Sequence, residues 1–436
     1  MVTAGPTVVI VGGGPVGLVA AHALEAAGIN FVLLEKRSSV YLDVGASLVL
    51  TGGSLRVLHQ LGILKNILPL GQELMERRSF TTNGQKISDT SFYYLKRNHG
   101  VAPLAFHRAE LVQSLYESLG NSAKSRILFN KKVVNITSND TVAVVQCADG
   151  STYEGTIALG VDGVHSKARQ AMLQLAKASN TGVDWASENP FHSTYRCLWF
   201  SIPRRTAPGE AYDTQFTDRS VMYNTGKDRG WVFLYEKIAL HKTEHDTRYT
   251  DKDIAALASR FQDYPITEEL KVKDVFSERT TCGMSNLDEG IMKQWSWGRI
   301  VLAGDACHKF TPNAGLGFQN GIQDVVALCN GLHKQFSAKS QVTLADLTEV
   351  FEVYQQQRLD AVRFDLKISA GMTRSQAWAT FAYSIISRFL AGLWIWDYIM
   401  LNWIISPAIR NSLTLDYITA EDPYRGTHAW KHSTVN

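Results

Sequence analysis

Three glycines and one acidic residue near the N-terminus have the types and spacing that bind a dinucleotide. Gly12, Gly14 and Gly17 form the pattern G-x-G-x-x-G. The first glycine permits a tight turn, the second lets the backbone approach a pyrophosphate, and the third allows a helix to pack closely. The carboxylate of Glu35 can accept hydrogen bonds from ribose hydroxyls, which favours FAD or NAD over NADP.

The segments around these residues follow the order that such a site needs. Residues 7–11 are β-branched and suit a buried strand. Residues 17–28 are rich in Ala and Leu, which predicts a helix that stops at a glycine. Residues 30–35 predict a second strand that ends in the acid. A lone glycine motif is weak evidence, whereas this strand–helix–strand order is specific for a dinucleotide site.

Two further apolar strands are predicted to end in an acidic residue next to glycine. Residues 298–305 end in Gly-Asp305, and residues 157–163 contain Asp162-Gly. The tail after Asp305 carries Gly315 and Gly317, which open a predicted helix. Backbone N–H groups at such a turn can hold an anion or an electron-rich ring, and Asp305 can bind a polyol hydroxyl.

These three motifs, in this order, resemble the fingerprints of the single-component FAD-dependent monooxygenases of the para-hydroxybenzoate hydroxylase class. The match runs from about residue 7 to residue 332. Residues 44–47, 106–111 and 308–313 are similar to a fungal branch that includes indole-diterpene and meroterpenoid epoxidases and is near to salicylate-hydroxylase-like enzymes.

The resemblance implies FAD contacts for Glu35, Gly45, Arg108 and Asp305. The complete set of predicted cofactor-binding residues is Gly12, Gly14, Gly17, Glu35, Gly45, Ala46, Arg108, Asp162, Asp305, Gly315, Gly317 and Phe318. In the family a small residue usually follows the second glycine of the tail, whereas this chain has Phe318. That difference puts the shape of the pocket near the flavin in question.

The resemblance also implies the chemistry. NADPH or NADH would reduce FAD, O2 would add to give a C4a-hydroperoxide, and one oxygen would pass to the substrate. The protein would bind, orient and exclude water, because the cofactor carries the difficult step. The chain has no second G-x-G-x-x-G, so the nicotinamide has no domain of its own and the motif around Asp162 is implicated. We predict no metal site.

The predicted fold class is α/β, with a Rossmann-like FAD-binding domain, a mostly antiparallel β substrate domain and C-terminal helices. The predicted FAD-binding domain comprises residues 1–75, 104–180 and 282–335. The predicted substrate domain comprises residues 76–103 and 181–281, and the helical region residues 336–436. Arg196 and Tyr223 resemble catalytic or substrate-polarising residues of related enzymes. The alternative is an arginine of an edge strand and a tyrosine that only packs.

One tract, residues 381–409, is strongly apolar, and flavin binding does not explain it. It holds three tryptophans between Arg388 and Arg410, but Asp397 and Pro407 interrupt it. Three interpretations stay open: helices that lie in a membrane interface, helices of a core or dimer interface, and a true span. A central Asp costs roughly 3 kcal/mol on insertion scales, which disfavours a span.

The charge and cysteine content of the chain limit the classes of binding partner and the cellular compartment that we expect. The net charge is only +3 at pH 7, with cations spread along the chain, so nucleic acid is not an expected partner. Five scattered cysteines fit an intracellular protein, with residues 381–409 as the candidate for contact with the cytosolic face of a membrane. The oligomeric state is left open.

We therefore predict an FAD-dependent monooxygenase that epoxidises an alkene of a prenylated or terpenoid intermediate. Hydroxylation of an aromatic or indole ring is the alternative, and a titratable group in the pocket would favour it. A prenyl-binding chaperone on a flavoprotein-like scaffold is the non-enzymatic alternative. A chaperone would not need the Gly-Asp and Asp-Gly motifs.

Overall fold

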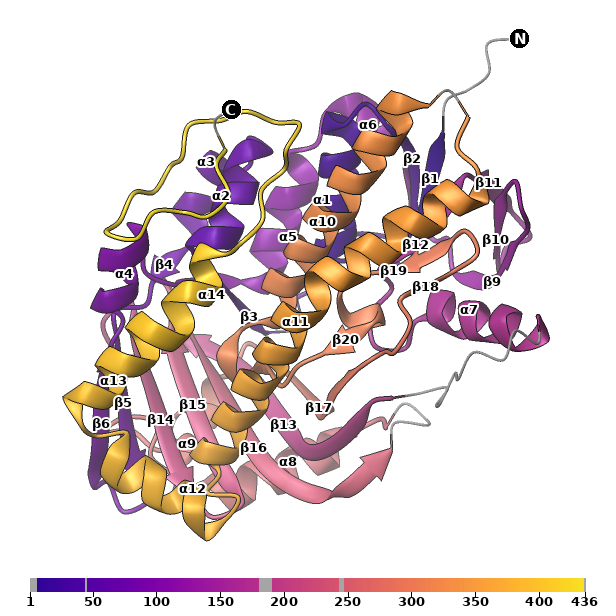
Figure 1. Ribbon diagram of the computed structural model, residues 1–436. Coiled ribbons are helices and arrows are strands. Elements are labelled where there is room, and N and C mark those ends of the chain that lie inside the picture. Colours follow the sequence, from indigo (N-terminus) through magenta and orange to yellow (C-terminus); the bar gives the residue numbers. More distant parts are fainter. Residues whose placement is uncertain (1–5, 44, 180–189, 243–246, 340, 435–436) are drawn as a thin grey trace.

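The computed structural model describes residues 6–43, 45–179, 190–242, 247–339 and 341–434. The chain forms two large sheets, with helices beside and between them (Figure 1). This arrangement confirms the predicted α/β class. The residue boundaries of the two domains stay a prediction, and part of the 181–281 segment lies outside the described residues.

The first sheet has six strands in the order β18-β19-β12-β1-β2-β8. Its strands are β1 (Thr7–Val11), β2 (Asn30–Leu34), β8 (Ile127–Leu128), β12 (Ile157–Gly160), β18 (Ser296–Trp297) and β19 (Ile300–Leu302). All neighbouring pairs are parallel except β18 with β19. Strands buried on both faces suit the β-branched sequence of β1.

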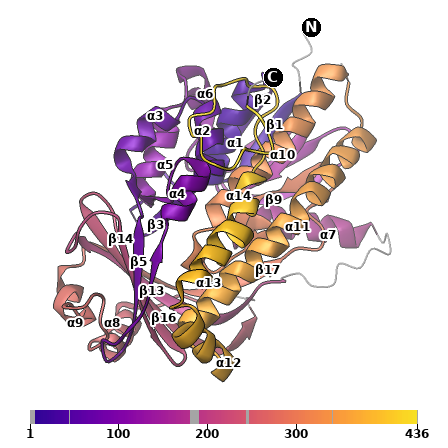
Figure 2. The ribbon, with the colours of Figure 1, turned by 60° about the vertical axis from the view of Figure 1, so that its left-hand side comes forward.

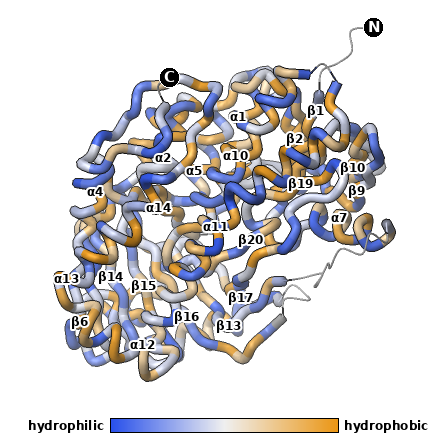
Figure 3. Tube along the Cα trace, viewed as in Figure 1, coloured by the Kyte–Doolittle hydropathy of each residue, from blue (hydrophilic) through white to orange (hydrophobic). Residues whose placement is uncertain are grey.

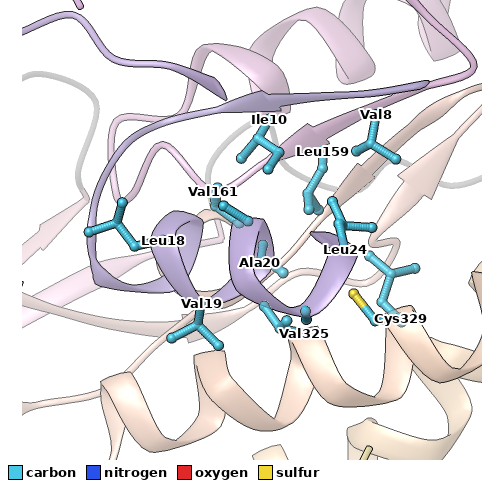
Figure 4. Packing of buried hydrophobic residues seen from close by; sticks show 14 of the residues in the cluster. Val8, Ile10, Leu18, Val19, Ala20, Leu24, Leu159, Val161, Val325 and Cys329 are labelled. Carbon is cyan, nitrogen blue, oxygen red and sulfur yellow. The ribbon is translucent and has the colours of Figure 1, made fainter. Parts of the chain in front are cut away.

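Helix α1 (Pro15–Ala26) packs between this sheet and α10 (Gly317–Ala338). Val8 and Ile10 of β1 point toward α1, and Val325 of α10 packs from its other side (Figure 4). The alternate residue Val9 faces Gly155 of β11 (Thr152–Gly155), where an added Cβ would meet its methyl group at 2.8 Å. A smaller sheet of β9 (Val133–Ser138), β10 (Ala143–Cys147) and β11 therefore covers the opposite face.

The second sheet has eight strands in the order β20-β17-β13-β16-β15-β14-β5-β6 and is mostly antiparallel. The strands are β5 (Glu76–Thr81), β6 (Lys86–Ser91), β13 (His192–Pro203), β14 (Glu210–Phe216), β15 (Arg219–Thr225), β16 (Arg229–Lys242), β17 (Thr281–Ile291) and β20 (His308–Lys309). Its apolar residues of one parity pack against α8 (Asp251–Phe261) and α9 (Val272–Val275). The other parity faces a cavity.

The C-terminal region begins with the long helix α11 (Leu344–Gln376), which runs from the first sheet to the second (Figure 1). Three short helices follow: α12 (Phe381–Ile385), α13 (Trp394–Ile399) and α14 (Ser406–Arg410), joined by π-helical turns. Figure 2 shows α13 and α14 lying along α11. The π-helical turn of residues 386–390 contacts β6, and α14 with the turn before it contacts α4 (Tyr93–His99), so this segment closes one side of the cavity.

A buried charged network fastens α10 and α11 to the turn after β19. The carboxylate of Asp324 on α10 accepts hydrogen bonds from Arg358 Nε of α11 at 2.9 Å and from the Gly304 backbone N–H at 2.9 Å. His308 Nε2 lies 2.6 Å from its Oδ2. Burial by itself would raise the pKa of Asp324, but His308 and Arg358 lower it to about 2. The network therefore positions the turn that contains Asp305.

We expect Asp324→Asn to destabilise the fold strongly, because it leaves the Arg358 guanidinium buried without its counter-charge. Breaking such a pair costs about 3–5 kcal/mol. The depressed pKa means that the wild-type contribution is present above about pH 4 and is lost as the pH falls toward 2. Denaturant unfolding at pH 7 measures the loss. Asp360→Asn on the exposed side of α11 is the control, and equal stability of the two variants would contradict the assignment.

Candidate functional site

The glycine-rich turn between β1 and α1 is tightly packed on the side of the protein and open on the side of the cavity. Gly12 has φ +113°, and an added Cβ would meet the Val161 carbonyl oxygen at 2.7 Å. A Cβ on Gly17 would collide with the carbonyl oxygen of Gly12. Gly14, the N-cap of α1, has nothing within 4 Å of its Cβ position and lines the cavity. The first N–H groups of α1 therefore open toward a ligand.

Glu35 lies at the end of β2 and is buried beside this turn. One carboxylate oxygen accepts a hydrogen bond from the Gly13 N–H at 2.7 Å, and the other accepts one from the Arg37 N–H at 2.9 Å. Each oxygen keeps a lone pair, and Glu35 also lines the cavity. It can bind a ligand hydroxyl while it holds the turn.

Two cations face the same end of the cavity. Arg108 begins α5 (Arg108–Glu117), and both Arg108 and Arg37 line the cavity. Burial, and then the nearby Arg37, lower the pKa of Arg108, while Asp305 partly opposes this shift. Within the described residues no side-chain hydrogen bond engages the Arg108 guanidinium. An anionic group bound here would offset the repulsion between the two cations.

The two strand-end aspartates play different structural parts. Asp305 receives a hydrogen bond from Lys309 Nζ at 2.7 Å and lines the cavity. Asp162 accepts hydrogen bonds from Ser166 Oγ at 2.5 Å and from the Lys167 N–H at 2.6 Å, at the start of α7 (Lys167–Ala178). Its burial raises its pKa. Asp162 therefore fixes a helix N-terminus at the edge of the cavity.

Most of the predicted cofactor residues meet around this one cavity. Those that line it are Gly12, Gly14, Glu35, Ala46, Arg108, Asp162, Asp305, Gly315, Gly317 and Phe318. Gly17 instead packs α1 against the turn, and Gly45, with φ +72°, lies against Thr281. Residue 44 of the predicted 44–47 segment lies outside the described residues.

The loop that leads into α10 is held by hydrogen bonds to side chains of α11. Asn313 donates a hydrogen bond to Gln376 Oε1 at 2.6 Å, and Ser369 donates one to the Thr311 carbonyl oxygen at 2.6 Å. Gly315 has φ +65°, and Phe318 is buried at the first turn of α10. The backbone of residues 315–317 is thereby presented to the cavity.

The cavity is large, about 1950 Å³, and joins two different environments. One end holds the glycine turn and the cations. The other lies between the second sheet and α12–α14 and includes Phe92, Phe233, Trp396 and Met400. Sites for one drug-sized molecule occupy roughly 300–1,000 Å³. The volume is therefore sufficient for a dinucleotide and a second molecule together.

A dinucleotide fits the first end. Open space in front of Gly14, a helix N-terminus, the half-buried Arg108 guanidinium and a free acceptor on Glu35 match a pyrophosphate and a ribose.

Comparison with known proteins identifies the dinucleotide. Residues 6–361 match the family described as FAD binding domain. The chain belongs to this family. The FAD-dependent monooxygenase penE of Penicillium thymicola is 31% identical over 98% of this chain and 90% of its own length. DEP2 of Alternaria brassicicola, also an FAD-dependent monooxygenase, is 30% identical over 98% and 82%. A third, verC1 of Penicillium polonicum, is 32% identical over 93% of this chain, which spans 51% of that relative.

These relatives confirm the predicted class: the chain is a single-component FAD-dependent monooxygenase. Solved structures confirm the fold. HpxO of Klebsiella pneumoniae, in complex with FAD and uric acid, superposes with a TM-score of 0.72 at 19% identity, covering 92% of this chain and 97% of HpxO. The tetracycline destructase Tet(51) gives a TM-score of 0.65 at 18% identity, over 92% and 99%.

The structure does not bring the predicted catalytic residues to the cavity. Tyr223 is fully buried on the α8/α9 side of the second sheet, where its hydroxyl accepts a hydrogen bond from the Arg205 N–H at 3.1 Å. Its neighbours Met222 and Asn224 line the cavity instead, because successive strand residues point to opposite faces.

Arg196 is likewise engaged elsewhere. Its Nε donates to Glu236 Oε2 at 3.0 Å, and Arg260 of α8 binds the same carboxylate. Neither residue lines the cavity, and direct catalytic roles for Arg196 and Tyr223 stay a prediction. The tyrosine packs, as in the alternative, whereas the arginine lies on the interior strand β13 and not on an edge strand.

Three side chains in the network of Asp324 lie close enough together to be considered as metal ligands. Ligand atoms of Cys307, His308 and Asp324 lie within 4.8 Å of one another. However, Asp324 is already bound by Arg358 and Gly304, and burial raises the pKa of the Cys307 thiol well above its ordinary value. A protonated thiol is a poor metal ligand, so the cluster serves the fold.

Sequence reasoning missed three charged residues of the second end. Arg77 of β5, Asp213 of β14 and Asp397 of α13 all line the cavity. The one signal for them was Asp397, a carboxylate in the middle of an apolar tract. Strand alternation could have placed the other two on the cavity side once Tyr212 and Phe80 were assigned to the core.

We expect Gly14→Val to weaken FAD binding at least tenfold without unfolding the chain. The added side chain enters open space, which is the space that lets the backbone approach a pyrophosphate. Flavin absorbance of the purified protein and FAD titration of the apoprotein measure the loss. Gly120→Val is the matched control, since Gly120 is also an extended N-cap glycine, its Cβ position meets only Glu25 Oε1 at an ordinary 3.8 Å, and it does not line the cavity. Equal FAD affinity of both variants would refute this role of Gly14.

Proposed function

We propose that this monooxygenase uses NAD(P)H and O2 to epoxidise an alkene of a lipophilic, prenylated or terpenoid molecule. The observation that carries the proposal is the single cavity that joins the dinucleotide end to an apolar chamber. A chamber walled by aromatic and aliphatic side chains favours a largely apolar substrate. An alkene needs no base in the protein to become a nucleophile.

In this proposal the glycine turn and Arg108 bind the pyrophosphate of FAD, and Glu35 binds a ribose hydroxyl. Asp305 binds the ribityl chain, and the backbone at Gly315 and Gly317 faces the ring system. When bound, FAD supplies the redox chemistry by which one oxygen atom of O2 reaches the substrate and the other leaves as water. The chain's own residues bind, orient and exclude water.

The reductant is proposed to bind only transiently. The chain has one G-x-G-x-x-G, and its turn is taken by FAD in this proposal. Asp162 lies at the edge of the cavity with His165 and Lys167, which also line it. The Lys167 cation at this edge would attract the phosphates of NADPH or NADH.

Ring hydroxylation is kept as a second candidate because of one observation. The chamber contains two carboxyl side chains, Asp213 and Asp397, beside the Arg77 guanidinium. A carboxylate near a phenol could take its proton and raise the electron density of the ring.

The two reactions are separated by a screen of NAD(P)H consumption with purified protein. Prenylated phenols, prenylated indoles and simple phenols are compared, and products are identified by mass spectrometry. Coupled turnover that yields an epoxide or its diol on the prenyl chain supports epoxidation. A new ring hydroxyl supports the second candidate. If the purified protein holds no flavin and consumes no NAD(P)H, both candidate reactions are wrong.

We further propose that α12–α14 rest on a lipid surface from which the substrate enters. No single described helix is long and apolar enough to cross a membrane, but residues 381–390 and 394–410 form a pair bent by 99° that passes by length and composition. In this pair several polar side chains face the protein interior and large apolar side chains face outward, the reverse of the usual arrangement. Ser387, Asn402 and Ser406 are buried, whereas Phe381, Phe389, Leu393, Trp394 and Trp403 are exposed. Figure 3 shows hydrophobic residues along α12 and α13 at the edge of the molecule.

The mouth of the cavity lies within this surface. Trp403, Ile404 and Pro407 are exposed and also line the cavity. The exposed cations Arg388, within the tract, and Arg410, directly after it, can reach lipid phosphates. The environment that best matches such a surface is the interface of a bilayer, which gives an apolar substrate a direct route.

We expect the full chain to float with phosphatidylcholine–phosphatidylserine vesicles, and the triple variant Phe381→Ser, Phe389→Ser, Trp394→Ser to lose this binding. Each large apolar side chain contributes roughly 1.5–3 kcal/mol when buried, so partitioning should fall more than 100-fold. The control is Val134→Ser, Leu240→Ser, Val353→Ser, which changes three exposed apolar residues elsewhere. A wild-type chain that does not float would contradict the membrane proposal.

A further inference from the structure

The apolar chamber contains a group of charged side chains that FAD binding does not need. Arg77 Nε lies 3.5 Å from Asp213 Oδ1, and this nitrogen is buried without a hydrogen bond. Asp397 Oδ1 accepts a hydrogen bond from Thr90 Oγ1 at 3.3 Å and is close enough to Arg77 for the cation to act on its pKa. We call Arg77, Asp213 and Asp397 the polar cluster.

Strand pairing places two members of the cluster, Arg77 and Asp213, diagonally across adjacent strands. Arg77 is opposite Thr90 in the pairing of β5 with β6, and Asp213 is opposite Ser79 in the pairing of β14 with β5. All four side chains line the cavity. Neighbouring side chains on one face of a sheet lie about 5 Å apart, so the cluster is a compact patch.

The sheet side of the cluster is held rigidly. Asp213 is 1% exposed and accepts hydrogen bonds from Ser79 Oγ at 2.7 Å and from Gln215 Nε2 at 2.7 Å. Gln215 Oε1 in turn accepts hydrogen bonds from Trp378 Nε1 at 3.0 Å and from Ser387 Oγ. Residues before and within the apolar tract therefore help to fix the position of Asp213.

The third member comes from the opposite wall. Asp397 lies on α13, and burial raises its pKa, with Arg77 and Thr90 acting in the other direction. A carboxylate in an apolar helix is costly unless it has a partner. It turns away from the exposed surface that carries Trp394 and Leu393. The cluster thus brings together donors and acceptors from both walls of the chamber.

We propose that the polar cluster binds a hydroxyl group at the polar end of an otherwise apolar substrate. A hydroxyl both donates and accepts, so it can donate to Asp397 while it accepts from the Arg77 guanidinium. A ligand carboxylate would face two like charges. An ammonium group would face the Arg77 guanidinium, and one of the two carboxylates, Asp213, already accepts hydrogen bonds from Ser79 and Gln215. This inference rests on the proposed function, because it assigns the chamber to the substrate.

The cluster would also fix the direction of the substrate. A molecule with one hydroxyl and a long apolar chain can lie either way in an apolar chamber, whereas a hydrogen-bonding site at one place selects one direction. The few polar groups then decide which carbon–carbon double bond comes to the flavin end. Among several equivalent alkenes, the one that reacts would be the one whose distance from the bound hydroxyl, along the apolar chain of the substrate, equals the distance from the polar cluster to the flavin end.

The test compares two probes that differ in one group, 2-farnesylphenol and its O-methyl ether. Binding to the FAD-loaded protein is measured by tryptophan fluorescence, since Trp396 and Trp403 line the cavity. We expect the phenol to bind about 10- to 100-fold more tightly, which corresponds to one hydrogen bond to a charged group. Arg77→Gln and Asp397→Asn should each reduce this ratio at least fivefold.

Asp360→Asn, an exposed change on α11, is the matched control and should leave the ratio unchanged. FAD content is measured for every variant. If Asp397 only held α13 in place, its variant would weaken both probes equally and the ratio would survive. Equal binding of both probes by the wild type, or no binding of either, would also overturn the inference.

The outcomes separate this inference from the proposed function. If both probes bind equally and both stimulate NAD(P)H oxidation, the hydroxyl site is wrong and the monooxygenase reaction stands. If the phenol binds selectively but no probe is oxygenated, the site stands and the proposed reaction is wrong.

Discussion

The pairing of Asp324 with Arg358 is the interaction on which both ends of the cavity depend. It joins α10, α11 and the turn that contains Asp305, inside a core where each partner is nearly or fully buried. A buried ion pair adds little net stability compared with apolar packing, but it tolerates only one arrangement of its elements. Here that arrangement sets the direction of α11.

Helix α11 carries this constraint from the dinucleotide end to the chamber. Near its C-terminal end, Ser369 and Gln376 bind the loop of residues 311–313. Arg374 is ion-paired with Glu289 of β17, in the second sheet. The short helices α12–α14 then start from a fixed point. The loop before α10 and the outer wall of the chamber are therefore positioned by one element.

The sequence allowed the dinucleotide end to be predicted because its signals are local. Gly12, Gly14 and Glu35 belong to one strand–helix–strand unit, where spacing dictates geometry. The chamber could not be predicted in this way. Arg77, Asp213 and Asp397 come from distant segments, and their meeting depends on the register of β5 with β14 and on the path of residues 381–410. Arg196 and Tyr223 show the same limit, since a shift of one residue along a strand reverses the face.

The apolar tract has an inward face, which binds the rest of the protein, and an outward face, which is apolar. Its sequence is consistent with both. Asp397 and Asn402 interrupt the hydropathy, and both turn inward: Asn402 accepts hydrogen bonds from Arg97 and Asn98 of α4. The interruptions therefore fasten the helices to the protein, and the outward side is left apolar. A helix that had to cross a bilayer would expose these groups to lipid on at least part of its surface. A bent pair that lies against the protein does not, and its exposed residues Trp403, Ile404 and Pro407 also line the cavity.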